Sequence, residues 1–215
     1  MKRKIVIVED HPLFREQLAM LINKQPDMEV CGETDNFQTA MEIIRTVKPD
    51  AAVVDITLKG SNGLEVLKEL KAQSVELPVL VLSMHDESLY AERVIRAGAQ
   101  GYITKNESAE KLVAAIRKVA GGDVYLSDGM TARLLKNISD GKKPDGTLTL
   151  ASLADRELEV FQLIGKGKTT REIAEMLKLE PTTVDTYRAR IKEKLNLKNA
   201  TQLVHLATDW VHNQV

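Results

Sequence analysis

The chain has 215 residues, of which 43% are hydrophobic, and this length allows two compact domains that each bury a core. Lys and Arg number 30 against 31 Asp and Glu, so the whole chain lacks a basic signature of nucleic-acid binding. The single cysteine, Cys31, excludes an internal disulfide, and with four scattered histidines it excludes a structural zinc site of the usual composition. We expect no signal peptide and no membrane span, and a reducing, cytoplasmic location fits the cysteine usage.

Residues 1–122 alternate short β-branched runs with amphipathic segments, the pattern of βα units around a parallel sheet. The expected strands are Lys4–Val8, Glu29–Cys31, Ala51–Val54, Val79–Leu82 and Gly101–Ile103. The expected helices lie near Leu13–Lys24, Thr39–Val47, Leu64–Ala72, Leu89–Ala97 and Glu110–Ala120. This order predicts an α/β fold with a doubly wound, flavodoxin-like (βα)5 parallel sheet.

Turn residues dominate the segment that follows. Gly121-Gly122 marks a shift in composition, a short helix is possible at Met130–Ile138, and residues 139–147 contain almost no apolar side chains. Beyond this segment only helical spacing remains. We therefore expect a first domain over residues 1–122, a linker over residues 123–148, and a smaller all-α domain over residues 149–215.

Polar residues follow four of the five expected strands at their carboxyl ends, where open α/β sheets hold ligands. They are Glu9 and Asp10, Asp55, Ser83 and Lys105. Any one of them could be an ordinary loop residue, but three carboxylates at one edge repel one another unless a cation neutralises them. An all-oxygen set suits Mg²⁺. With Lys105 and Ser83 as ligands for phosphoryl oxygens, the sequence predicts phosphoryl transfer onto a carboxylate.

Five stretches of this region resemble the receiver domain of bacterial response regulators of the NarL/FixJ family. They are Ile5-Val-Ile-Val-Glu-Asp-His-Pro-Leu-Phe-Arg15, Val53-Val-Asp-Ile-Thr-Leu58, Gly63-Leu-Glu65, Val81-Leu-Ser-Met-His-Asp86 and Ala97-Gly-Ala-Gln-Gly-Tyr-Ile-Thr-Lys105. The resemblance implies that a histidine kinase donates phosphate to Asp55. It also implies that Ser83 and Lys105 bind the phosphoryl group.

By the same resemblance, Glu9 and Asp10 hold Mg²⁺ together with Asp55 and the backbone carbonyl of Thr57. Tyr102 matches the aromatic residue that changes rotamer on activation, although the sequence alone equally suggests an aromatic half-buried on an edge strand. Lys59 stands where the family commonly has proline. That departure affects loop stiffness and phosphate lifetime but removes no ligand.

The second domain carries the start signals of a helix-turn-helix. Thr169-Thr-Arg-Glu172 is a capping box, and Pro181 suits the first position of a helix that extends to about Leu195. On that helix Val184, Ile191 and Leu195 share one face. The opposite face is either solvated or presented to a partner. The positive charge of the chain is concentrated here, with five basic and two acidic residues between positions 182 and 198.

This region resembles the LuxR-type DNA-binding domain in Leu153-Ala-Asp-Arg-Glu-Leu-Glu-Val160, Leu163-Ile-Gly-Lys-Gly167, Glu172-Ile-Ala174, Thr183-Val184 and Ile191-Lys-Glu-Lys-Leu195. The resemblance implies double-stranded DNA as partner, with contacts from Thr183, Asp185, Thr186, Arg188, Ala189, Arg190, Lys192 and Lys194. Asp185, Thr186 and Ala189 match base-facing positions. Lysine is common at the first and last of these, so we expect an altered recognition sequence. Ala154 replaces the usual capping Ser or Thr, and Tyr187 replaces a common histidine.

A last helix is expected near Ala200–Val211, with Leu203, Leu206 and Trp210 at helical spacing. The resemblance makes it a homodimer contact, and a role in the core alone is the alternative. The sequence thus favours a phosphorylation-controlled transcription regulator that is not an enzyme. An aspartyl-phosphate hydrolase is the second hypothesis, but such enzymes usually need an acid where Thr57 stands. A regulator whose receiver is never phosphorylated is the third.

Overall fold

The computed structural model of the chain describes residues 2–58, 61–84, 87–139 and 150–212. Contacts between residues divide the chain into two compact units, Met1–Asp140 and Gly141–Val215. The domain boundaries expected after residues 122 and 148 stay predictions, and most of the turn-rich segment 139–147 lies outside the described residues. Within the described ranges, no helix is both long and apolar enough to cross a lipid bilayer.

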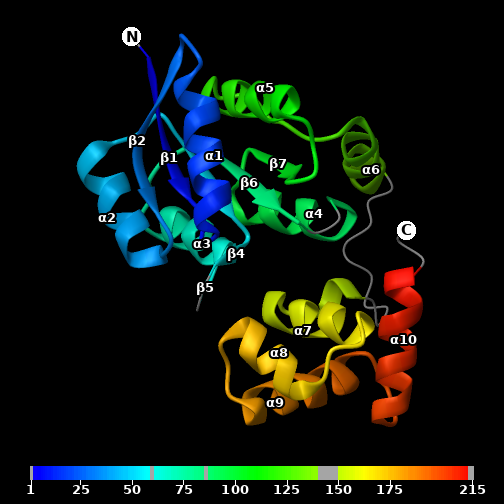
Figure 1. The fold of residues 1–215 in the computed structure, drawn as a ribbon. Coiled ribbons are helices and arrows are strands. Elements are labelled where there is room, and N and C mark those ends of the chain that lie inside the picture. Colours follow the sequence, from blue (N-terminus) through cyan, green and yellow to red (C-terminus); the bar gives the residue numbers. More distant parts are fainter. Residues whose placement is uncertain (1, 59–60, 85–86, 140–149, 213–215) are drawn as a thin grey trace. The chain divides into compact units, whose positions relative to one another are not determined.

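A parallel sheet forms the centre of the described part of the first unit (Figure 1). Its strands are β1 (Arg3–Val8), β2 (Met28–Thr34), β3 (Ala51–Asp55), β6 (Val79–Ser83) and β7 (Gly101–Thr104). They lie in the order β2-β1-β3-β6-β7, and every neighbouring pair is parallel. The strand order reverses direction between β1 and β3. A ligand crevice is therefore expected beyond the carboxyl ends of these two strands.

Helices cover both faces of the sheet. They are α1 (Pro12–Asn23), α2 (Phe37–Val47), α3 (Gly63–Ala72), α4 (Glu87–Ala97) and α5 (Ala109–Ala120). Helix α1 contacts α5 on one face, and α2, α3 and α4 contact one another in turn on the other (Figure 1). The predicted doubly wound α/β fold is confirmed. The chain forms it because its central strands are aliphatic on both faces and its helices are apolar on one.

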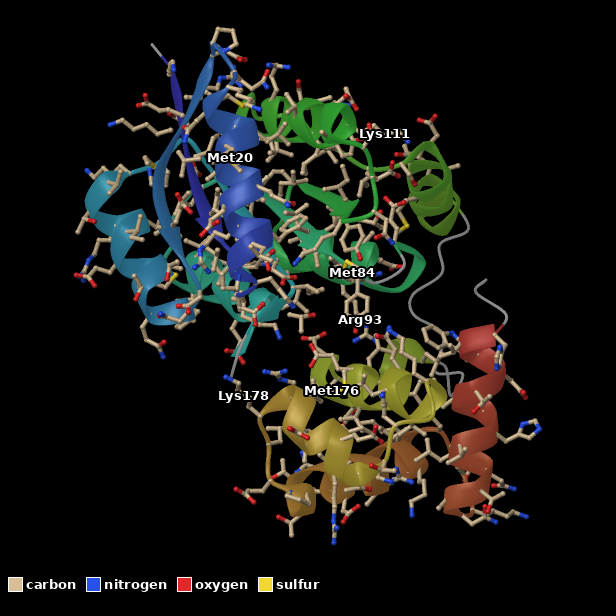
Figure 2. All side chains as sticks on the ribbon, viewed as in Figure 1. Met20, Met84, Arg93, Lys111, Met176 and Lys178 are labelled. Atoms are coloured by element: carbon tan, nitrogen blue, oxygen red, sulfur yellow. The ribbon has the colours of Figure 1, made fainter. Side chains whose placement is uncertain are left out.

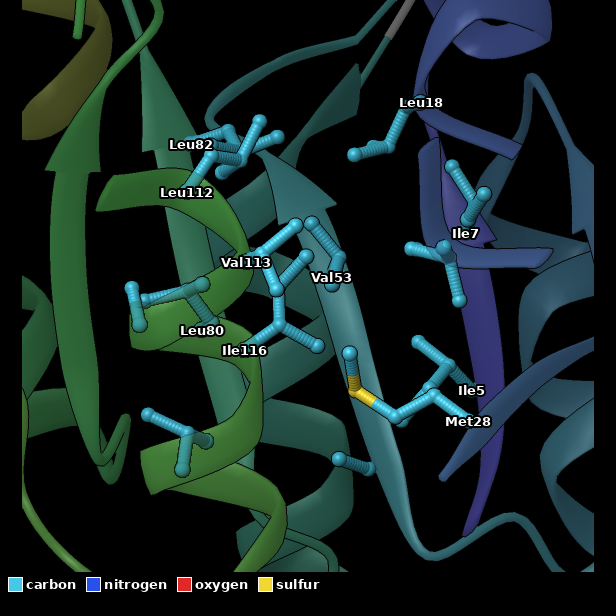
Figure 3. Packing of buried hydrophobic residues seen from close by; sticks show 14 of the residues in the cluster. Ile5, Ile7, Leu18, Met28, Val53, Leu80, Leu82, Leu112, Val113 and Ile116 are labelled. Atoms are coloured by element: carbon cyan, nitrogen blue, oxygen red, sulfur yellow. The ribbon is translucent and has the colours of Figure 1, made fainter. Parts of the chain in front are cut away.

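Aliphatic side chains from strands and helices close the core on the α1 and α5 side of the sheet (Figure 3). Ile5 and Ile7 of β1 and Leu80 of β6 pack in one cluster with Leu18 of α1 and Ile116 of α5. All five are at most 2% exposed. Because a close-packed interior leaves the strands little freedom, the residues just beyond their carboxyl ends are held in place as well.

A short antiparallel hairpin follows β3 and was not predicted. It consists of β4 (Thr57–Leu58) and β5 (Ser61–Asn62). Strands of two residues are too short to produce a periodic hydrophobic pattern, which explains why the sequence gave no sign of them. Lys59, the departure from the family's usual proline, lies outside the described residues.

After α5 the chain returns to the edge of the sheet beside β7. The Tyr125 N–H donates to the carbonyl of Gln100 at 2.9 Å, and the Tyr125 carbonyl accepts from the Tyr102 N–H at 3.0 Å. Helix α6 (Asp128–Ser139) then packs against α4, with Met130 buried. This helix covers the segment for which a short helix was expected, and it belongs to the first compact unit.

The described part of the second unit is helical throughout, which confirms the predicted all-α domain. It contains a 3-10 turn, η1 (Leu150–Ser152), and the helices α7 (Asp155–Gly165), α8 (Thr170–Leu177), α9 (Pro181–Lys194) and α10 (Ala200–His212). Phe161 of α7, Ile191 of α9 and Leu203 of α10 are fully buried in its core. Helices α7 and α10 approach closely at Gly165, where a Cβ atom would collide with the carbonyl oxygen of Ala207.

Candidate functional site

Three carboxylates meet at the carboxyl edge of the sheet. Glu9 and Asp10 follow β1, and Asp55 ends the neighbouring strand β3. Their residues are 0%, 6% and 2% exposed. One ligand atom from each, together with one from His11, can be chosen so that all lie within 4.8 Å of one another. The structure thus brings together the acidic residues that the strand-end argument placed at one edge.

The ammonium group of Lys105 balances part of this negative charge. Its Nζ atom lies 2.6 Å from Oε2 of Glu9 and 2.9 Å from Oδ2 of Asp55, and the side chain is 5% exposed. The same nitrogen lies 4.7 Å from the centre of the Phe14 ring, a contact that the sequence did not indicate. One ammonium group therefore forms ion pairs with two of the three carboxylates.

Burial, and after it the nearby charge of Glu9, raises the pKa of Asp55 from 3.8 to about 6. The Lys105 ammonium and the Thr57 N–H oppose this shift because both stabilise the ionised carboxylate. Burial and the repulsion from Glu9 are the larger effects, so the pKa of Asp55 is raised overall. A bound cation would act in the opposite direction, since positive charge favours the ionised form.

The loop after Asp55 is held tightly against it. The Thr57 N–H donates to Oδ1 of Asp55 at 3.1 Å, and the Gly63 N–H donates to the carbonyl of Ile56 at 2.8 Å. A Cβ atom at Gly63 would overlap the carbonyl oxygen of Asp55, so only glycine allows α3 to begin here. The metal-binding role of the Thr57 carbonyl stays a prediction.

Ser83 and Tyr102 lie on the two strands at the other side of the crevice. Ser83 ends β6, is fully buried, and its carbonyl accepts from the Lys105 N–H at 2.8 Å. Tyr102 lies within β7 and is only 1% exposed, so it is a buried aromatic residue on an edge strand. Its backbone N–H pairs with the Tyr125 carbonyl, which connects β7 to the segment that leads into α6.

A helix-turn-helix occupies the centre of the second unit. The capping box is present: the Thr169 N–H donates to the Glu172 carboxylate at 2.8 Å, and the Glu172 N–H donates to the Thr169 hydroxyl at 3.3 Å. Lys178, labelled in Figure 2, ends α8 with a left-handed φ of 53°. Pro181 begins α9. The expected helix boundaries are confirmed.

The two predicted faces of α9 differ in burial as expected. Val184, Ile191 and Leu195 are buried, whereas Asp185, Thr186 and Ala189 are exposed. Thr183 and Arg188 are half-buried, and Arg190 is exposed. The Thr170 hydroxyl of α8 donates to Oδ1 of Asp185 at 3.4 Å, so this carboxylate is held where the two helices meet.

Lys194 has a partner that sequence reasoning missed. Its Nζ atom lies 2.7 Å from Oε2 of Glu157, a residue that is 3% exposed. The same carboxylate oxygen accepts from the Ala154 N–H at 2.7 Å, which supports the start of α7 although Ala154 has no capping side chain. Glu157 therefore joins the first turn of α7 to the end of α9.

The residues expected at the dimer contact separate into core and surface. Leu203 is fully buried, so it belongs to the domain core and is not available to a second copy. Trp210 is half-buried, with its ring 5.9 Å from that of Phe161. Leu206 is 38% exposed and Val204 is 42% exposed. Leu206 keeps the expected exposure, and Val204 is an exposed apolar neighbour that the prediction omitted.

Two family models match the chain. Residues 5–117 match the response regulator receiver domain, and residues 151–207 match the bacterial regulatory proteins of the luxR family. The chain belongs to the NarL/FixJ family of response regulators. Like its family, this response regulator joins a receiver to a DNA-binding domain and is a phosphorylation-controlled regulator of transcription.

Relatives of similar length match nearly the whole chain. NreC of Staphylococcus carnosus, an oxygen regulatory protein, is 35% identical to this response regulator over 208 residues, which cover 95% of this chain and 96% of NreC. BvgA of Bordetella pertussis, named as a transcription regulator, is 35% identical over 207 residues, which cover 96% and 97% of the two chains. The structure of RcsB from Salmonella enterica serovar Typhimurium, bound to promoter rprA with the phosphomimetic BeF3⁻, has a TM-score of 0.62 at 20% identity. That match covers 97% of this response regulator and 99% of the RcsB chain, and it shows a common fold.

Proposed function

We propose that Asp55 is the phosphoacceptor of this response regulator and that a histidine kinase is its phosphodonor. The observation that carries the proposal is the buried Asp55 carboxylate at the end of β3, 2.9 Å from the Lys105 ammonium. In the reaction a carboxylate oxygen of Asp55 attacks phosphorus while the bond from phosphorus to the donor nitrogen breaks. Lys105 and Ser83 would bind oxygens of the transferred group.

Mg²⁺ is the cation that we assign to the acidic cluster. Its oxygen donors fit this ion, and Oδ1 of Asp10 is a buried atom that accepts no hydrogen bond from the described residues. When bound, the ion would neutralise charge on the phosphoryl oxygens and on the carboxylates. Glu9, Asp10 and Asp55 would hold it, with the Thr57 carbonyl as a further oxygen ligand.

The phosphorylated aspartate is proposed to persist as a signal, so the protein is not an enzyme in its main role. A hydrolase of the aspartyl-phosphate type needs an acid near the acceptor to protonate the leaving group. Thr57 occupies that position, and its N–H donates to Asp55. A threonine hydroxyl is far too weak an acid for this task at neutral pH.

Helix α9 is proposed to read DNA in the major groove. Its exposed Asp185, Thr186 and Ala189 would face bases, while Thr183, Arg188, Arg190, Lys192 and Lys194 would hold the backbone. We assign the homodimer contact to the exposed apolar side of α10, at Leu206 with Trp210 at its border. RcsB, which shares the fold, has been seen as dimers bound to DNA.

Phosphorylation by a small-molecule phosphodonor tests the assignment of Asp55. With Mg²⁺, intact-protein mass spectrometry is expected to show one added phosphoryl group on the wild type and none on Asp55→Asn. The matched control is Asp50→Asn, since Asp50 lies at the opposite end of β3 and accepts from the Lys4 N–H. Full labelling of Asp55→Asn would assign the acceptor to another residue.

A further inference from the structure

His11 lies beside the acidic cluster and was no part of the predicted ligand set. It precedes α1, and its backbone N–H donates to Oε1 of Glu9 at 3.0 Å. Its ring nitrogen Nδ1 lies 3.1 Å from the same Glu9 oxygen and 2.9 Å from Oδ1 of Asp10. The imidazole is 69% exposed, whereas both carboxylates are buried. The ring therefore borders the cluster on its solvent side.

These separations agree with ligands of a common cation. Two ligand atoms at right angles around an ion, with bonds of about 2.1 Å, lie about 3 Å apart. Nδ1 of His11 has this separation from both carboxylate oxygens. Oδ1 of Asp10 belongs to a side chain that is 8% exposed and accepts no hydrogen bond from the described residues. This buried oxygen therefore lies 2.9 Å from Nδ1 of His11 without forming a hydrogen bond to it.

The neutral imidazole has two tautomers, and only one of them leaves Nδ1 free to bind a cation. With a proton on Nδ1, the ring donates to Glu9; with the proton on Nε2, the Nδ1 lone pair is a ligand. Nε2 can carry the proton at little cost because most of the ring is exposed to water. A cation that binds nitrogen strongly favours the second state.

We propose that Nδ1 of His11 is a ligand of the divalent cation held by Glu9, Asp10 and Asp55, and that it gives this site a preference for first-row transition ions such as Co²⁺ and Ni²⁺ over Mg²⁺. The inference rests on the proposed function, because it requires this cluster to hold a divalent cation. Imidazole suits the later transition ions, whereas Mg²⁺ prefers oxygen. His11 is thus a residue that determines which ion occupies the phosphorylation site.

Calorimetric titration of the untagged, full-length protein with MgCl₂, CoCl₂ and NiCl₂ tests the proposal. His11→Phe keeps a planar ring but removes the nitrogen, and it breaks no side-chain cap. The matched control is His205→Phe in α10, whose ring is 77% exposed and lies beside a single carboxylate, that of Asp209. Circular dichroism is expected to show the same fold for all three proteins.

His11→Phe is expected to weaken Co²⁺ and Ni²⁺ binding by about tenfold or more while Mg²⁺ affinity changes less than about twofold. His205→Phe is expected to leave the affinities for Co²⁺, Ni²⁺ and Mg²⁺ unchanged. An equal loss for all three ions would overturn the nitrogen-ligand proposal, since the ring would then only position the carboxylates. Unchanged Co²⁺ and Ni²⁺ binding would also overturn it. Failure of wild-type protein to bind any of the ions would instead contradict the proposed cation site itself.

Discussion

Asp55 is destabilised in its ionised form within the folded receiver, because burial and Glu9 raise its pKa to about 6. The folded state therefore retains a proton that the unfolded chain releases near pH 4. Between these two values the folded protein binds more protons than the unfolded chain, so this residue lowers stability as pH rises. If Asp55 is the phosphoacceptor, as proposed, its burial beside other carboxylates lowers the stability of the folded receiver above about pH 4.

We predict that Asp55→Asn is more stable than the wild type in the presence of EDTA. The gain in unfolding free energy is expected to be absent near pH 4, to grow as pH rises through about 6, and to level off at about 1–3 kcal/mol. Urea unfolding of both proteins across this range measures the difference. A gain of equal size at pH 4 and pH 7 would mean that the ionisation of Asp55 is not its cause.

Lys192 and Lys194 are expected to differ although both are lysines near the end of α9. Within the described residues Lys192 forms no ion pair, whereas Lys194 pairs with the buried Glu157. Lys192→Ala should reduce the slope of the logarithm of the DNA-binding constant against the logarithm of salt concentration by up to about one unit. It should leave the unfolding free energy unchanged. Lys194→Ala should lower the unfolding free energy by about 1–3 kcal/mol, because it removes the ammonium that pairs with the buried Glu157 carboxylate.

Salt titrations of DNA binding and urea unfolding of both variants provide this comparison. Equal stability of the two variants would show that the Glu157 pair contributes little. A salt dependence that Lys194→Ala leaves unchanged would remove the Lys194 ammonium from the proposed phosphate contacts, and the same result for Lys192→Ala would remove Lys192.

At the scale of elements, α10 has apolar residues both in the domain core and on the surface, where we propose the dimer contact. Leu203 is fully buried against the core, whereas Leu206 is 38% exposed. In a two-fold dimer an exposed residue near the axis meets its own copy, so Leu206→Asp would bring two negative charges together. Dimerisation of the phosphorylated protein is expected to weaken by about tenfold or more, with little change in thermal stability.

Leu203→Ala is the contrast within the same helix. It is expected to lower the unfolding free energy by about 2–5 kcal/mol because it leaves a cavity in the core. Sedimentation equilibrium and thermal unfolding distinguish the two effects. If Leu206→Asp dimerises as well as the wild type, the dimer contact lies on another surface.

Sequence periodicity predicted the elements that bury a face, because burial imposes the spacing that the pattern reveals. The carboxylates at the ends of β1 and β3 could be predicted for the same reason, since parallel strands bring their carboxyl ends to one edge. The pair between Lys194 and Glu157 could not be predicted, because it depends on how α9 packs against α7. The pairing of Tyr125 with β7 could not be predicted either, because a contact made by a single residue produces no repeating pattern in the sequence.

Over the whole molecule, the receiver can control DNA binding only through a difference in free energy between its states. If Asp55 is the phosphoacceptor, as proposed, its phosphorylation must favour a state that dimerises or binds DNA more tightly, and the shift can be no larger than that preference. The hydrogen bond from the Tyr102 N–H to the Tyr125 carbonyl connects β7 to the segment that leads into α6, and we expect such a change to reach α6 through this contact.

Thermodynamic linkage allows the coupling between the receiver and the DNA-binding domain to be measured in two ways, through DNA affinity and through beryllofluoride affinity. If the phosphomimetic beryllofluoride raises the affinity for a DNA site chosen from a random-sequence pool, that DNA must raise the affinity for beryllofluoride by the same factor. We expect a factor of roughly 5–150, the usual range for such coupling. Fluorescence anisotropy with labelled DNA at varied beryllofluoride, and the converse titration, measure the two sides, and Asp55→Asn should abolish both effects. Binding of beryllofluoride at Asp55 with no change in DNA affinity would favour the remaining hypothesis, a regulator whose receiver does not control DNA binding by phosphorylation.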